Sequence, residues 1–66
     1  MRIRVNGEER QLPDGRTVQQ LLVSLGMASD GVAVAVNTAV IPRGEHPVHT
    51  LREGDHVEVI RAVGGG

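Results

Sequence analysis

The sequence predicts an α+β roll in which one helix packs across one face of a small sheet. Three observations predict it: an alternating strand with a hairpin signal at the start, one amphipathic helical segment, and further apolar strands after that segment. With 66 residues the chain forms one domain at most. It contains no Phe, Tyr, Trp or Cys, so we expect an aliphatic core without disulfides or thiolate-bound zinc.

The first five residues alternate between apolar and charged side chains, as in a half-buried strand whose Ile3 and Val5 face the core. Asn6 and Gly7 follow, and this pair is typical of a tight hairpin because both residues tolerate a positive φ. A second short strand is expected over residues 9–12, ending at a Pro-Asp-Gly turn.

A helix is expected to begin after Thr17, whose hydroxyl would form a capping box with Gln20. Four apolar side chains recur at helical spacing and would share one face: Val18, Leu21, Leu22 and Leu25. Gly26 supplies the left-handed residue that ends the helix.

More strands are predicted after the helix. Residues 32–36 form an apolar run, which indicates a strand with apolar side chains on both faces. A short strand over 39–41 would end at Pro42, a loop without periodicity would occupy 43–50, and a last strand would cover 56–63. The strands would add six side chains to the core: Ile3, Val5, Val34, Val36, Val57 and Val59.

The last predicted strand places apolar side chains on the face away from the helix. Because Val57 and Val59 would face the core, Ile60 and Ala62 would point to the opposite side. With Ala33 or Ala35 from the neighbouring strand, they would form a small apolar patch of the kind that binds another protein. The alternative is that a loop covers Ile60 and Ala62.

The sequence ends in Gly64, Gly65 and Gly66, which predicts a thin flexible tail over 64–66 attached to a domain over 1–63. Glycine loses the most backbone entropy on ordering, so a run of glycines is poorly suited to packed structure. Such a tail could enter a narrow channel and present the Gly66 carboxylate to another protein. A carboxylate accepts a nucleophile only after one oxygen becomes a leaving group, which implies ATP-dependent adenylation by a partner and then acyl transfer. A frayed terminus is the alternative.

Composition argues against several other functions. The net charge of −1 and the lack of aromatic side chains disfavour nucleic-acid binding. No signal peptide or membrane-spanning run is present, so we expect a cytoplasmic protein that does not bind membranes. His46, His49 and His56 lack the spacing of metal ligands, and we expect no metal and surface positions for loop histidines. Neither Ser24 nor Ser29 lies in a nucleophile-type turn, so we expect no enzymatic activity.

Several short stretches occur in a specific order, although each is common by itself. They are IRVNGE (3–8), LPDG (12–15), TV (17–18), LL (21–22), GVAVAVN (31–37), VIPR (40–43), GDHVE (54–58) and GG (65–66). In this order and at this length, the whole chain resembles the small sulfur carrier proteins of thiamine biosynthesis, the ThiS family. The resemblance implies the ubiquitin-like β-grasp fold, a mixed sheet of four to five strands with one helix on one face.

The resemblance also implies a mechanism and partners. An E1-like adenylyltransferase of the ThiF or MoeB kind would transfer AMP from Mg-ATP to the Gly66 carboxylate, with Gly64 and Gly65 in its active site. Sulfur from a cysteine desulfurase or another donor would displace AMP and leave a thiocarboxylate, which a ThiG-like thiazole synthase would consume. The carrier itself would bind no cofactor and catalyse nothing. A glycine at position 64 departs from the simplest family pattern and lengthens the tail by about 3.5 Å.

Three alternatives stay open from the sequence. The chain could carry sulfur for another pathway, such as the synthesis of molybdopterin, of cysteine or another metabolite, or tRNA thiolation. It could be a ubiquitin-like modifier that shares the adenylation step and ends in an amide to a target lysine. It could also be a β-grasp binding module of the RNA-associated kind, although this chain lacks a basic face.

Overall fold

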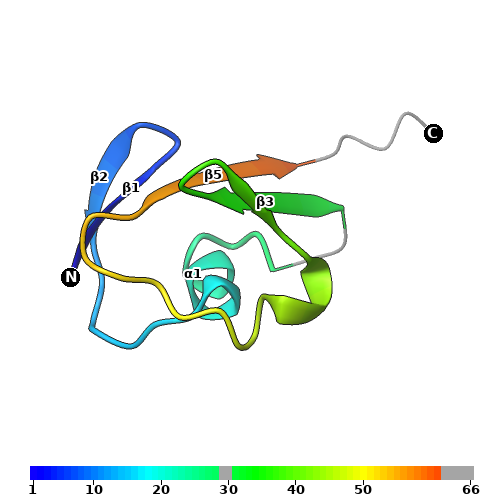
Figure 1. Cartoon of the computed structure of the whole chain (residues 1–66), viewed down its shortest axis with the longest axis horizontal. Helices are drawn as coiled ribbons and strands as arrows, with labels where there is room; N and C mark the ends of the chain where they lie inside the picture. Colours follow the sequence, from blue (N-terminus) through cyan, green and yellow to red (C-terminus); the bar gives the residue numbers. More distant parts are fainter. Residues whose placement is uncertain (29–30, 62–66) are drawn as a thin grey trace.

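A sheet of five strands carries one helix on one of its faces in the computed structural model, which describes residues 1–28 and 31–61 (Figure 1). The elements in chain order are β1 (Arg2–Val5), β2 (Glu8–Gln11), α1 (Val18–Ser24), β3 (Val32–Val36), β4 (Ala39–Ile41), the short 3-10 helix η1 (Arg43–Glu45) and β5 (His56–Arg61). The strands lie in the order β2-β1-β5-β3-β4. Since β1 and β5 are parallel and the other neighbours antiparallel, the sheet is mixed, as expected.

Two tight hairpins turn the chain at asparagine residues. Asn6 (φ 51°) and Gly7 (φ 84°) connect β1 to β2, and Asn37 (φ 51°) and Thr38 (φ 71°) connect β3 to β4. Two consecutive residues with positive φ are the requirement of a type I′ turn, whose twist matches that of the strands. The first hairpin was predicted correctly, except that β2 begins and ends one residue earlier than expected.

The capping box predicted for α1 is present. Thr17 Oγ1 accepts a hydrogen bond from the Gln20 backbone N–H (3.2 Å), and Gln20 Oε1 accepts one from the Thr17 N–H (2.9 Å). Gly26 has φ 70° just after the helix, which is the left-handed position predicted for it.

The core lies between α1 and the sheet. Nine of the ten predicted core side chains are buried there, and the tenth, Leu25, is half-buried and packs against them. Ile41 and Leu51 also belong to the core, and sequence analysis had not included them. A chain of this size has a small free energy of unfolding, so the loss of any one of these buried side chains removes a large part of it.

The segment between β4 and β5 is more ordered than the predicted loop. It contains η1, and His46 directly after η1 is only 4% exposed, so the expectation of a surface position is wrong for this histidine. Burial is possible because His46 Nε2 donates a hydrogen bond to the Ile41 carbonyl (3.1 Å), which satisfies a polar atom that would otherwise lose water. His49 is half-buried and His56 is exposed.

Candidate functional site

The central strand β5 leads towards the glycines at the end of the sequence, so the candidate site is built around it. Val57 and Val59 point to the helix and are buried, as predicted. Ile60 points to the opposite face and is 61% exposed, so no described loop covers it. The predicted strand residues 62 and 63, with Ala62 of the predicted patch, lie outside the described residues, and so does the tail of Gly64, Gly65 and Gly66.

The pairing of β5, β3 and β4 brings the described patch residues together on the outer face of the sheet. Ile60 lies opposite Ala33, and Ala35 lies opposite Val40. Residues opposite each other in an antiparallel pair project to the same face. Val40 is 76% exposed, Ala33 is exposed and Ala35 is half-buried. We call the surface formed by Ala33, Ala35, Val40 and Ile60 the outer apolar patch.

Val40 is the member of the outer apolar patch that sequence analysis missed. The signal was available, because a two-residue turn at Asn37 and Thr38 fixes the register of β3 and β4 and places Val40 opposite Ala35. In Figure 1, α1 and the segment between η1 and β5 lie on one side of the sheet, and no described element covers the other side. The patch is therefore open in the described part of the chain.

The rest of the outer face is charged. Arg2 and Arg4 of β1 alternate with the buried Ile3 and Val5, and Glu9 of β2 lies opposite Arg4. Arg2 Nε and Glu9 Oε2 form an exposed ion pair of 3.4 Å, which contributes little to stability. The outer face is thus apolar over β3, β4 and Ile60 of β5. It is charged over β1 and β2 and at the exposed Glu58 of β5, which lies opposite Ala35.

Two asparagine carboxamides hold β5, one near each end. Near its end, Asn6 Oδ1 accepts a hydrogen bond from the Val59 N–H (2.8 Å), and Asn6 Nδ2 donates to the Val59 carbonyl (3.1 Å). At its start, Asn37 Oδ1 accepts from the His56 N–H (2.9 Å), and Asn37 Nδ2 donates to Asp55 Oδ1 (3.0 Å). The two hairpin turns therefore fix the position of the strand between them.

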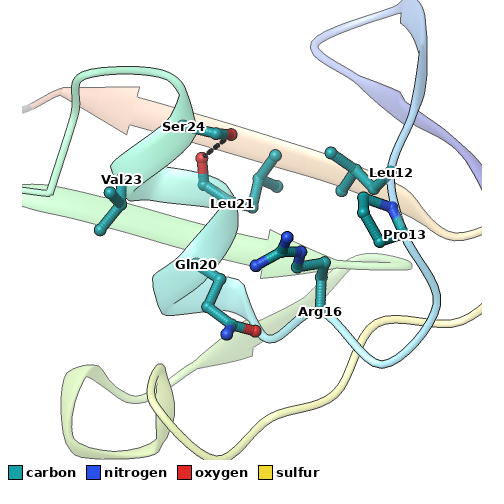
Figure 2. A pocket seen from close by; sticks show the side chains of 7 residues that line it. All are labelled: Leu12, Pro13, Arg16, Gln20, Leu21, Val23 and Ser24. Carbon is teal, nitrogen blue, oxygen red and sulfur yellow. Dashed lines mark hydrogen bonds between the residues drawn. The ribbon is translucent and has the colours of Figure 1, made fainter.

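A separate hollow of about 300 Å³ lies on the helix side of the molecule (Figure 2). Its walls come from the loop after β2 and from α1, and the Arg16 side chain reaches towards the helix between them. Most of the exposed lining is apolar, from residues that include Leu12, Pro13, Leu21 and Val23. No carboxylate, histidine or other proton-transfer group is among its lining residues, so the hollow offers no acid–base chemistry.

Within 1–28 and 31–61, no three histidine or carboxylate side chains gather in a way that could hold a metal ion. In that same part of the chain, no helix has the length and apolar character needed to cross a bilayer.

Comparison with known proteins gives a consistent result. The ThiS family model matches residues 3–66. The sulfur carrier protein ThiS of Escherichia coli is 32% identical over 66 residues, which cover 100% of both chains. The crystal structure of the thiamine biosynthesis protein ThiS from Geobacter metallireducens superposes with a TM-score of 0.84 at 32% identity, again over 100% of both chains. This similarity confirms the β-grasp fold.

A longer relative is also similar. The thiazole synthase of Magnetococcus marinus is 42% identical over all 66 residues, and the chain spans 20% of the length of that protein. A segment equivalent to this chain is therefore part of a larger polypeptide in that relative.

Proposed function

This chain belongs to the ThiS family, and we propose that it is a sulfur carrier of thiamine biosynthesis whose sulfur is bound at the Gly66 carboxyl group. The observation that carries the proposal is the match to the family over residues 3–66, which includes the glycines at the end of the sequence. The full-length similarity to the E. coli sulfur carrier protein ThiS supports it.

The proposed chemistry takes place on the carrier and is performed by its partners. A Gly66 carboxylate oxygen attacks the α-phosphorus of Mg-ATP on an E1-like adenylyltransferase, and pyrophosphate leaves. A sulfur nucleophile derived from a cysteine desulfurase or another donor then attacks the acyl carbon, and AMP leaves. With hydrosulfide as the nucleophile, loss of one proton gives the thiocarboxylate directly. The carrier is a cosubstrate in this scheme and has no cofactor or catalytic group of its own.

Thiazole synthase is the proposed acceptor of the sulfur. A segment similar to this chain makes up a fifth of the M. marinus thiazole synthase, so carrier and synthase belong to one polypeptide there. Joining carrier and synthase in one polypeptide raises the effective concentration of the carrier near the synthase. Such an arrangement favours a function in which the two act together. In this protein we propose that the carrier likewise passes its sulfur to a thiazole synthase.

We assign the outer apolar patch to recognition of the adenylating enzyme. The patch lies beside the end of β5, and Ile60 precedes Gly66 by six residues. Six extended residues span at most about 20 Å, so an enzyme bound at the patch could receive the tail in an active site within that distance. The patch is apolar and open, as expected of a surface that another protein covers.

The test is the intact mass of the protein after incubation with the adenylyltransferase of its own organism, Mg-ATP and sodium sulfide. We expect a mass increase equal to the exchange of one oxygen for one sulfur. A variant without Gly66 should show no increase although it remains folded. Absence of any increase in the full-length protein, with an enzyme that consumes ATP, would contradict the proposal. A stable amide to another protein would instead identify a modifier.

A further inference from the structure

We propose that Asn6 is a positioning residue for the adenylation of Gly66. Its carboxamide fixes the end of β5 and thereby directs the residues that follow into the active site of the partner enzyme. This inference rests on the proposed function, and it concerns a residue that lies far from Gly66 in the sequence and that would not contact ATP.

The geometry shows why the Asn6 side chain is needed at this point. The backbone N–H groups of Arg4 and Asn6 donate to the carbonyls of Asp55 and Val57, both at 2.9 Å, along the edge of β5 that faces β1. The chain then turns away at Asn6 and Gly7, so β1 supplies no further backbone partner for this edge. The Asn6 carboxamide takes over and bonds both the N–H and the carbonyl of Val59.

Val59 is the last described position at which β5 has a partner along both of its edges, the Asn6 carboxamide on one and β3 on the other. On its other edge, β5 continues to pair with β3, with Ile60 opposite Ala33 and Arg61 opposite Val32. On the β1 edge, the partners recorded within residues 1–28 and 31–61 end with the carboxamide at Val59. Without the Asn6 carboxamide, the last hydrogen-bonded group of β5 on this edge would be the Val57 carbonyl, two residues before Val59.

The position of Val59 matters because Gly66 is the seventh residue after it. Seven extended residues reach at most about 25 Å, so the place at which β5 is held limits which active-site positions Gly66 can reach from a docked carrier. In-line attack of the carboxylate on phosphorus requires the reacting atoms to be held about 3–3.5 Å apart, and loss of such alignment lowers the rate of the chemical step. Docking through the outer apolar patch does not involve Asn6, so binding should be retained.

Asn37 provides a matched control within the same chain. It has the same φ of 51°, occupies the equivalent position in its hairpin, and its carboxamide also makes two hydrogen bonds. These bonds hold the start of β5 at His56, the end of the strand that is remote from Gly66. Asn6→Gly and Asn37→Gly remove equivalent side chains, and glycine retains the left-handed backbone in both variants.

The experiment measures kcat and KM for each carrier variant as the substrate of the adenylyltransferase, by ATP–pyrophosphate exchange. For Asn6→Gly we expect kcat to fall about tenfold with KM within about twofold of the wild-type value. For Asn37→Gly we expect an unchanged kcat, even if its free energy of unfolding falls as much as that of Asn6→Gly. Loss of folded carrier alone would raise the apparent KM and leave kcat unchanged, so the two parameters separate positioning from stability.

Amide hydrogen exchange gives a second readout that needs no enzyme. Exchange at the Val59 N–H should accelerate in Asn6→Gly and not in Asn37→Gly, after correction for global unfolding. Equal kcat values for wild type and Asn6→Gly, or equal losses in both variants, would overturn the inference while the proposed function stands. A wild-type carrier that is not adenylated would overturn both.

Discussion

Thr17 faces Thr50 in a single antiparallel bridge that connects the start of α1 to the segment before β5. Backbone hydrogen bonds flank the bridge on both sides, from the Val18 N–H to the His49 carbonyl (2.9 Å) and from the Leu51 N–H to the Arg16 carbonyl (2.8 Å). The bridge therefore satisfies one of the free N–H groups of the first helical turn and aligns Leu51 with the core. This segment is thus part of the packed structure.

Leu51→Ala should strongly destabilise the protein. Leu51 is 2% exposed and lies in the core cluster. Truncating a buried leucine to alanine loses about 2–5 kcal/mol through lost burial and the cavity that remains. In a small domain this is a large part of the total free energy of unfolding. Urea denaturation followed by circular dichroism measures the change.

Val48→Ala is the control for this substitution, because Val48 lies in the same segment and is 73% exposed. Its free energy of unfolding should stay within about 0.5 kcal/mol of the wild-type value. Equal stabilities of the two variants would show that the segment does not pack as described.

Thr17→Ala should lower the free energy of unfolding by about 1 kcal/mol, because it removes the side-chain acceptor for the Gln20 N–H. Thr17→Ser retains a hydroxyl at the same place and should keep most of that stability. Thermal unfolding of the three proteins under one set of conditions checks the order. If serine destabilises as much as alanine, the threonine methyl group contributes the stability and the cap does not.

The elements that sequence analysis predicted well are those whose signals are local. The capping box of Thr17 and Gln20, the Asn6-Gly7 turn and the alternation around Ile3 and Val5 each involve residues a few positions apart. The alternation of side chains along a strand likewise predicts that Ile60 points away from the helix, because Val57 and Val59 point towards it. That part of the candidate site can therefore be predicted from the sequence.

The features that sequence analysis missed depend on contacts between distant parts of the chain. Leu51 is buried because its segment pairs with residues 16–18, and no periodicity in 43–50 indicates this. His46 is buried because the Ile41 carbonyl accepts its N–H. Asp55 is buried and accepts hydrogen bonds from the Arg52 N–H (2.8 Å) and the Asn37 side chain. Each contact needs a register that only the assembled sheet defines.

Ile60→Asp should weaken binding to the adenylating enzyme more than it destabilises the fold. The side chain is 61% exposed, so the substitution removes little core packing and places a charge in the outer apolar patch. We expect the Kd to rise at least about tenfold, equivalent to about 1.4 kcal/mol. Isothermal titration calorimetry with the enzyme measures the affinity.

Val23→Asp is the matched control, since Val23 is 60% exposed but lies on α1, on the opposite side of the sheet. Its Kd should stay within about twofold of the wild-type value. Equal weakening by both substitutions would indicate a general effect of added negative charge, and unchanged affinity of Ile60→Asp would reject the patch as the binding surface.

Val40→Asp tests whether the binding surface extends to β4. Val40 lies opposite Ala35 on the outer face, so an enzyme that covers Ile60 and Ala33 would reach it only if the interface crosses β3. We expect a several-fold rise in Kd, smaller than that of Ile60→Asp because Val40 is farther from the end of β5. Val48→Asp has nearly the same exposure, 73% against 76%, and lies outside the patch, so it should leave the Kd unchanged. A loss of affinity in Ile60→Asp without one in Val40→Asp would confine the interface to β5 and β3.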